Sequence, residues 1–350
     1  MTRTKICLAS DNWTPAHPDI IQAIIEANAG FTPSYGADPW TERAQILIEK
    51  TFGSRCKTFI VPTGTGANIF AFKLSCKSYE SIICSDISHI EYQESGATEA
   101  ITGCKLLTIP SSNGKITPDA IQKKLLKERA FGRHSTSPRL LSIAQPTEMG
   151  TVYSLQELAE LSAMCRQENL LFHIDGSRLY NAVVSLNTSL ETIVQTGNID
   201  TISLGGTKNG LMGAEALVIF NKTLESGSDH LQKQTLQLLS KMRYTSAQFI
   251  PFFAKGLWEE LASQANQKAK ELAKHIEAIP DLSLSAPVET NQIFFTAPPE
   301  WIPLIQEEIF CYLWNHEKHE LRFITSWCTT SDDIAAVKRT LEKIEKGHRF

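Results

Sequence analysis

The sequence predicts an α/β protein with a mostly parallel central sheet, in a large domain followed by a small one. Short runs rich in Val, Ile and Leu alternate with longer amphipathic runs, which is typical of strands joined by helices. Several short runs are apolar throughout, as expected for strands covered on both faces. The 350 residues are enough for two domains. We place the large domain at 1–250, and a linking helix with a small C-terminal α/β domain at 251–350.

The first part of the chain is expected to alternate strands with helices. The predicted strands are Phe59–Val61, Ser81–Cys84, Lys105–Ile109, Leu140–Ala144, Leu170–Ile174, Thr201–Leu204 and Ala216–Ile219. The predicted helices are Asp19–Ala29, Thr41–Phe52, Ala67–Ser75, Pro118–Lys127 and Leu155–Gln167. Ser154 and Glu157 have the spacing of a capping box at the start of the last of these helices.

The pattern changes after Phe220. Residues His230–Ile276 are almost continuously compatible with a helix, and Pro251 is expected to interrupt it. The tail then predicts, in order, a strand, a helix, a strand and a helix at Asn291–Phe295, Pro303–Leu313, Leu321–Ser326 and Asp332–Lys346. Ser331 is the expected N-cap of the final helix.

Composition excludes several classes of function. The hydrophobic share of 42% and the charged share of 21% are those of an ordinary globular protein. With a formal net charge of −4, the chain has no excess of positive charge that would attract nucleic acid or an anionic membrane. No apolar run approaches a membrane span, and the N-terminus lacks the apolar core of a signal peptide. The eight cysteines form no CxxC pair, so we expect reduced thiols, no metal site and a soluble, cytoplasmic protein.

A glycine-rich turn carries Lys208 between two of the predicted strands. The four nearby glycines are Gly205, Gly206, Gly210 and Gly213. Glycine permits positive φ and the close approach of a bulky partner, and lysine is seldom buried without a reason. Such a lysine can form a Schiff base with a carbonyl cofactor or substrate. Taken alone, however, a surface hairpin with a solvated lysine is the more frequent explanation.

Three other stretches change that interpretation of Lys208. The turn Thr63–Asn68 leads from a strand into a helix, and its backbone N–H groups and threonine hydroxyls suit a phosphate. Asp175 ends an apolar strand, where it can pair with a ring nitrogen or simply cap the next turn. His89 follows another strand and can stack on a flat ring, or be an ordinary surface histidine. A phosphate nest, a strand-end aspartate and a glycine-flanked lysine together are what pyridoxal phosphate requires.

Five motifs carry a resemblance to a known family. They are Tyr35-Gly36-Ala37-Asp38, Thr63–Asn68, Ser88-His89-Ile90, Asp175–Leu179 and Gly206–Gly210. Over essentially its whole length the chain resembles the threonine aldolase/β-eliminating lyase group of fold-type-I pyridoxal-phosphate enzymes, and most of all the low-specificity L-threonine aldolases. The resemblance implies an aspartate-aminotransferase-like fold. It also implies retro-aldol cleavage of L-threonine or L-allo-threonine to glycine and an aldehyde.

The resemblance implies roles for individual residues. Lys208 would hold the cofactor covalently, Asp175 would pair with the pyridine nitrogen, and His89 would stack on the ring. Gly64 and Thr65 would contact the cofactor phosphate. The substrate carboxylate would be bound by Ser10, Arg178 and Arg322, and Arg178 would also lie beside the cofactor. Tyr35 and Arg243 would reach the site of a neighbouring subunit. Because sites of this family lie at a subunit interface, a homodimer or homotetramer is expected.

One motif departs from the family. Many relatives carry Asn-Thr-His where this chain has Pro146-Thr147-Glu148, so Glu148 is expected near the substrate hydroxyl. It can take the hydroxyl proton if burial raises its pKa, or it can merely shape the pocket. Three alternatives stay open: a β-eliminating amino-acid lyase, a catalytically silent fold-type-I binding module, and a cofactor-free Schiff-base aldolase.

Overall fold

The computed structural model describes residues 5–347, and its centre is a seven-stranded sheet with the order β2-β8-β7-β6-β5-β3-β4. The strands are β2 (Lys57–Val61), β3 (Glu80–Ser85), β4 (Lys105–Ile109), β5 (Ser137–Ala144), β6 (Leu171–Gly176), β7 (Thr201–Leu204) and β8 (Glu215–Ile219). β8 is antiparallel to both of its neighbours, and the remaining neighbours pair in parallel. The predicted fold class, α/β with a mostly parallel sheet, is confirmed.

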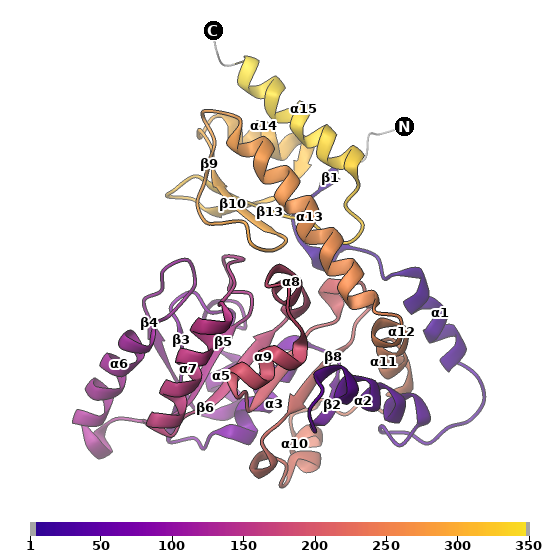
Figure 1. Ribbon diagram of the computed structural model, residues 1–350, viewed down its shortest axis with the longest axis vertical. Helices are drawn as coiled ribbons and strands as arrows, with labels where there is room; N and C mark the ends of the chain where they lie inside the picture. The colour runs from indigo at the N-terminus through magenta and orange to yellow at the C-terminus, as the bar shows by residue number, and fades with distance from the viewer. Residues whose placement is uncertain (1–4, 348–350) are drawn as a thin grey trace.

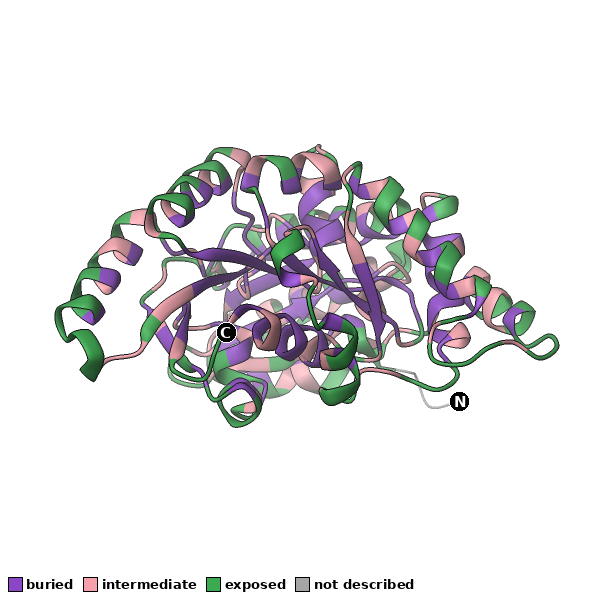
Figure 2. Cartoon of the chain, turned by 90° about the horizontal axis from the view of Figure 1, so that it is seen from below, coloured by how far each residue is buried: buried purple, intermediate pink, exposed green. Residues whose placement is uncertain are grey.

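Helices cover both faces of this sheet, so that buried strands lie between helices with exposed outer surfaces (Figure 2). The helices of this part are α1 (Pro18–Ala27), α2 (Pro39–Phe52), α3 (Gly64–Ser75), α4 (His89–Tyr92), α5 (Ala97–Thr102), α6 (Pro118–Ala130), α7 (Leu155–Glu168), α8 (Leu179–Ser185), α9 (Leu190–Gly197), α10 (Ser228–Gln234), α11 (Arg243–Ala247) and α12 (Phe249–Ala254). Short 3-10 turns lie at Asp11–Trp13, Gly132–His134, Thr207–Asn209 and Lys222–Leu224. Phe59 and Val61 pack on α3, whereas Ile60 between them packs in the core of the opposite face. Alternate side chains of the apolar strands therefore pack into two hydrophobic cores, one on each face of the sheet.

A second, smaller sheet with the order β12-β13-β10-β9 lies at the C-terminal end of the chain (Figure 1). The elements of this C-terminal part are α13 (Leu257–Glu277), β9 (Ser283–Leu284), β10 (Gln292–Thr296), α14 (Trp301–Glu308), β11 (Ile309–Phe310), β12 (Tyr312–Asn315), β13 (Glu320–Ile324) and α15 (Ser331–Gly347). The long helix α13 runs from the large sheet's helices to this part (Figure 1). β1 (Ile6–Cys7) pairs in parallel with β11, and Leu8 lies in the core of the small part. The boundary at residue 250 stays a prediction.

Three local predictions are wrong, each for a local reason. Pro251 lies in the first turn of α12, where its missing N–H is not needed, and the helical run is interrupted at 235–242, 248 and 255–256 instead. The helix predicted over Pro303–Leu313 ends at Glu308, and two short strands follow. Thr330 rather than Ser331 caps the last helix, because its Oγ1 accepts the N–H of Asp333 at 3.1 Å.

The capping box predicted at Ser154 is confirmed. The Ser154 hydroxyl accepts the N–H of Glu157 at 3.2 Å, and a Glu157 carboxylate oxygen accepts the N–H of Ser154 at 2.7 Å. Both bonds satisfy N–H groups that a helix leaves without an internal partner. The start of α7 is therefore fixed by the sequence itself.

Candidate active site

Three turns meet beside Ser177, at the carboxyl ends of β2, β6 and β7. A Cβ on Gly205 would lie 2.3 Å from the carbonyl oxygen of Ser177, so only glycine allows these two backbones to approach. A Cβ on Gly64 would lie 3.9 Å from the Ser177 hydroxyl oxygen, in ordinary contact. The lysine turn, the aspartate turn and the turn before α3 therefore lie side by side. Ligands of open α/β sheets bind at this edge.

A cavity at this edge reaches from the large sheet to the small one. Its lining contains six of the predicted site residues, namely His89, Glu148, Asp175, Arg178, Lys208 and Arg322. Gln292 and Trp314, from strands of the small sheet, close it from the other side. The structure thus brings together groups that are far apart in sequence. Ser10, Gly64 and Thr65 lie outside this lining.

Lys208 lies on the 3-10 turn Thr207–Asn209 between β7 and β8. The buried Glu215 carboxylate fixes this turn by accepting the N–H of Gly206 at 3.0 Å and that of Thr207 at 3.4 Å. Within residues 5–347, the Lys208 amine has no hydrogen bond or ion pair, and it lines the cavity. Desolvation, and then the charge of Arg178, lower the pKa of Lys208. A lowered pKa makes the neutral, nucleophilic amine more available.

Asp175 keeps its charge although it is buried. Its Oδ1 accepts the N–H of Ser177 at 3.0 Å and the Ser177 hydroxyl at 2.6 Å, and its Oδ2 accepts the side-chain N–H of Asn68 at 2.9 Å. Burial alone would raise the pKa of Asp175, but these bonds and the charge of Lys208 lower it below its ordinary value. Asp175 therefore caps its turn and also presents a fixed negative charge to the cavity.

His89 begins α4 and is held from two directions. Its backbone N–H donates to Glu148 Oε1 at 2.9 Å, and its Nδ1 lies 2.9 Å from Oε1 of the buried Glu94. The Asn68 side chain donates to the same Glu94 oxygen at 3.1 Å and to Asp175, so one amide joins both carboxylates. His89, Glu94 and Asp175 have ligand atoms within 4.8 Å of one another. Because the Asn68 amide lies between the carboxylates, we assign the group to positioning rather than to metal binding.

The start of α3 forms a candidate anion site at Thr63, Gly64 and Thr65, which we call the anion cup. The Thr63 hydroxyl accepts the N–H of Gly66 at 3.1 Å, whereas the N–H groups of Gly64 and Thr65 have no partner among the described residues. Free N–H groups at a helix N-terminus favour phosphate. The side-chain amide of Gln237 lies over Gly66, where a Cβ would be 2.1 Å from its Oε1. Gln237 therefore forms one wall of the cup.

The two predicted carboxylate-binding arginines differ in their partners. Arg178 donates from Nε and Nη2 to the buried Asp11 at 2.6 and 2.8 Å. Arg322 donates only to the Ala9 carbonyl at 3.3 Å, and its buried Nε has no partner in residues 5–347. Its guanidinium carbon lies 4.2 Å from the centre of the Trp314 ring. Ser10 caps the adjacent 3-10 turn by accepting the N–H of Asn12 at 3.2 Å.

Glu148 is a partly buried residue that lines the cavity together with Lys208. Burial raises the pKa of Glu148 to about 7, although the hydrogen bond from the His89 N–H acts in the opposite direction. A carboxyl group with such a pKa exchanges protons near neutral pH. The position fits a general base, and it equally fits a residue that shapes the pocket.

Tyr35 and Arg243 lie outside the cavity of their own chain. Tyr35 is 52% exposed, and its N–H donates to the Ser240 carbonyl at 3.0 Å. Arg243 donates to the Gly30 carbonyl at 3.0 Å and stacks on Tyr244. The two residues therefore occupy adjoining segments at the molecular surface.

Sequence reasoning missed several residues that hold the site. They are Asp11, Asn68, Glu94, Glu215, Gln237 and Trp314. Glu215 carried a usable signal, since it is a charged residue at the start of an otherwise apolar strand. The others are polar or aromatic residues whose partners are far away in sequence, so no local pattern marks them.

The chain is similar to known proteins over most of its length. Residues 8–298 match the family model described as beta-eliminating lyase. A protein of a Pseudomonas species named low specificity L-threonine aldolase is 36% identical over 330 residues, which is 94% of this chain and 95% of the relative. Its namesake in Pseudomonas aeruginosa is 35% identical over 96% of this chain and 97% of its own length.

Solved structures give the same result for the fold. A Leishmania major threonine aldolase superposes with a TM-score of 0.92 at 29% identity, covering 97% of this chain and 99% of that one. An archaeal alanine:glyoxylate aminotransferase has a TM-score of 0.73 at 16% identity, covering 99% of this chain and 92% of that one, a likeness of fold alone. The chain therefore has the fold-type-I architecture.

Proposed function

Because this chain belongs to the beta-eliminating lyase family, we propose that it is a pyridoxal-phosphate-dependent lyase that cleaves L-threonine, L-allo-threonine and related β-hydroxy-α-amino acids to glycine and an aldehyde. The observation that carries the proposal is the Lys208 amine, which has no partner among the described residues and lies close to the charged Asp175 and to the anion cup at α3. The relatives named L-threonine aldolase support the choice of reaction.

The residues present fit pyridoxal phosphate. The free N–H groups of Gly64 and Thr65 would hold its phosphate, Asp175 would pair with its pyridine nitrogen, and Lys208 would attach it covalently. His89, held by Glu94, would lie on the ring face. When bound, the cofactor supplies an electron sink for the pair of electrons left on Cα when the Cα–Cβ bond breaks.

Arg322 has the free hydrogen-bonding capacity that a substrate carboxylate needs. Its guanidinium faces the cavity without an acidic partner in the described chain, whereas Arg178 already has Asp11. An arginine–carboxylate pair fixes orientation as well as position, because the guanidinium offers a planar fork of donors. Arg178 would add positive charge and keep Asp11 in place.

Glu148 would remove the β-hydroxyl proton. It lines the same cavity, and burial raises its pKa to about 7, so the ionised form is present at neutral pH. Its oxygen would accept the proton from the hydroxyl as the aldehyde forms. The N–H of His89 holds Glu148 at this position.

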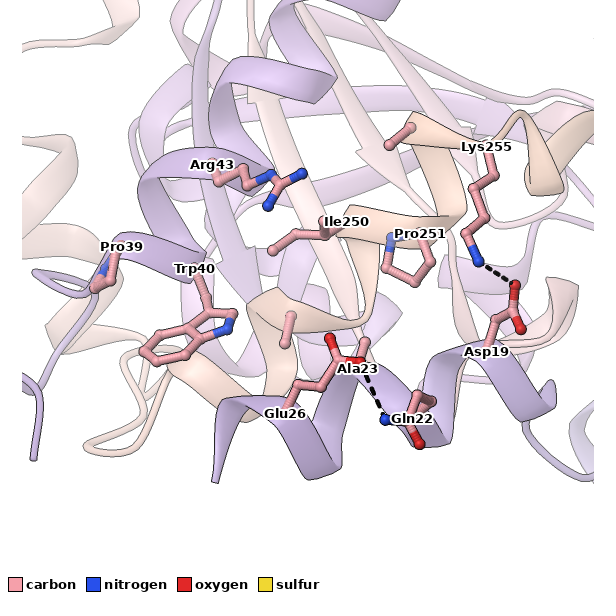
Figure 3. Close-up of a pocket in the computed structure, with 12 residues that line it drawn as sticks. Asp19, Gln22, Ala23, Glu26, Pro39, Trp40, Arg43, Ile250, Pro251 and Lys255 are labelled. Atoms are coloured by element: carbon pink, nitrogen blue, oxygen red, sulfur yellow. Dashed lines mark hydrogen bonds and ion pairs between the residues drawn. The ribbon is translucent and has the colours of Figure 1, made fainter. Parts of the chain in front are cut away.

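A second copy of this chain would complete the site. Tyr35 and Arg243 lie outside the lining of their own cavity, and the segment before α2 exposes the whole of the Phe31 side chain. A groove between α1, α2 and α12, lined by Trp40 and Ile250, lies on the same part of the molecule (Figure 3). We propose that this surface contacts the second copy.

Within residues 5–347, no helix is both long and apolar enough to cross a membrane.

The family description itself favours one second candidate, β-elimination, which would use the same anchors. The test is to load the purified protein with pyridoxal phosphate and supply L-threonine or β-chloroalanine in parallel. We expect glycine and acetaldehyde from threonine as the main products. Pyruvate and ammonia from β-chloroalanine, without glycine from threonine, would contradict the aldolase proposal and favour the lyase alternative.

A further inference from the structure

Aromatic rings surround Arg322 on the small sheet. Arg322 lies on β13, with Tyr312 of β12 directly opposite on one side and Phe294 of β10 directly opposite on the other. The guanidinium carbon of Arg322 is 4.2 Å from the Trp314 ring centre and 5.3 Å from that of Tyr312. Both distances are within the range in which a cation is attracted to an aromatic face.

Trp314 owes its position to an irregularity of the sheet. Leu313 pairs with Leu321 and Asn315 pairs with Glu320, so Trp314 is the extra residue of a bulge. A bulge changes the direction of a side chain, and such bulges occur often beside active sites. The Phe294 ring meets the Trp314 ring edge-on, with centroids 5.7 Å apart and an interplanar angle of 71°. The indole is therefore fixed against its own sheet.

The partners of Arg322 leave its charge free toward the cavity. No carboxylate in residues 5–347 forms an ion pair with it, and its Nε is buried without a hydrogen bond. Arg178, on the same cavity, has a bidentate carboxylate partner instead. The aromatic faces attract the cation without neutralising it, which a carboxylate would do.

We propose that Trp314 is a positioning residue, whose indole face holds the Arg322 guanidinium in the orientation that receives the substrate carboxylate. This inference rests on the proposed function, in which Arg322 binds that carboxylate. Tyr312 supports the same guanidinium from a greater distance. An ion-paired arginine would have to exchange partners when substrate binds, whereas Arg322 is held ready and unpaired.

The test measures glycine binding to the cofactor-loaded enzyme through the change in its visible absorbance. Replacing Trp314→Leu removes the aromatic face, so we expect the dissociation constant of glycine to rise about tenfold. Trp314→Phe restores a face and should stay within about threefold of the parent. Methylamine, which lacks a carboxylate, should bind the parent and both variants equally. In steady state, KM for threonine should rise in Trp314→Leu with little change in kcat.

Tyr312→Leu provides a second variant with little risk to folding, because Tyr312 is 43% exposed. It should weaken glycine binding about threefold. The matched control is Tyr79→Leu, since Tyr79 is also exposed and also faces a cation, Lys77 at 5.9 Å, far from the cavity. This control should bind glycine as the parent does.

Two results would overturn the inference. The first is unchanged glycine affinity in Trp314→Leu, or in Tyr312→Leu if the tryptophan variant does not bind cofactor. The second is an equal loss of glycine and methylamine affinity, which would indicate general damage. Failure of the parent enzyme to bind glycine would instead contradict the proposed function, and with it the role of Arg322.

Discussion

The Asp11 carboxylate binds the Arg178 guanidinium through two hydrogen bonds, from Nε at 2.6 Å and from Nη2 at 2.8 Å. Burial would raise the pKa of Asp11, but the charge and hydrogen bonds of Arg178 lower it, so the pair is ionised. Among residues 5–347, the site thus contains one arginine neutralised by a carboxylate and one, Arg322, without a carboxylate partner. The two arginines therefore differ in their partners, and no local sequence pattern marks that difference.

The first prediction concerns Arg322. Replacing Arg322→Gln removes the charge-assisted bonds to the substrate carboxylate, so KM for L-threonine should rise about 100-fold, with a smaller fall in kcat. Steady-state kinetics give both constants. The control is Arg55→Gln, since Arg55 is paired with Glu225 at the surface and should leave both constants unchanged. An unchanged KM in Arg322→Gln would remove Arg322 from substrate binding.

The second prediction concerns Glu148 as the base. Burial raises its pKa to about 7, so kcat/KM should rise with pH and level off above that value as the carboxylate ionises. Glu148→Gln should lower kcat about 100-fold and abolish the rise of kcat/KM with pH. Glu148→His should keep such a rise, because histidine also gains and loses a proton near neutral pH. A Glu148→Gln enzyme with the parental pH profile would assign the proton transfer to another group.

The third prediction is that Glu148 lowers stability at alkaline pH. Its pKa is about 7 in the folded protein and 4.5 ordinarily, so between these values the folded state binds one proton more than the unfolded state. Stability from this group is therefore full below pH 4.5 and is lost as pH rises through 7, by about 3 kcal/mol.

Urea unfolding of the parent and Glu148→Gln, under identical cofactor conditions, tests this prediction. The free energy of unfolding of the variant, relative to the parent, should be larger at about pH 8 than at about pH 5. Glu99→Gln, at an exposed carboxylate, should show no such dependence. An equal difference at both pH values would mean that Glu148 is not held in a desolvated site.

The fourth prediction concerns the second copy. If Arg243 acts on the partner's site and Lys208 on its own, a dimer of Lys208→Ala and Arg243→Ala chains has one intact site. Co-expression of the two inactive variants should therefore restore about a quarter of the parental activity. Activity no higher than that of the separate variants would place both residues in the same site.

Much of the fold could be predicted because its signals are local. The strands β4 and β7 occur at the predicted residues, since apolar runs between turns mark strands buried on both faces. Over Pro303–Leu313 the apolar pattern suits a helix and a strand equally, and the pairing of β11 with β1 decides the outcome. That partner lies about 300 residues away, beyond any local pattern.

The candidate site was predictable where a motif carries chemistry, as at Lys208, Asp175 and the turn before α3. The role of a residue was not predictable where it depends on a hydrogen-bond partner far away in the sequence. Asn68 ended the predicted turn, yet its amide joins Asp175 to Glu94 only because the end of β6 and the loop after α4 both lie within hydrogen-bond distance of it. The position of Asp11 in the site likewise depends on its hydrogen bond from Arg178, which is 167 residues away in the sequence.

The proposed function depends above all on covalent attachment of the cofactor at Lys208, which can be measured on the purified protein. The purified protein is loaded with pyridoxal phosphate, reduced with borohydride to make the attachment permanent, digested and mapped by mass spectrometry. We expect one phosphopyridoxyl adduct, on the peptide that contains Lys208, and none in Lys208→Ala. An adduct on another lysine, or the same adduct yield in Lys208→Ala, would contradict the assignment of Lys208 as the attachment site.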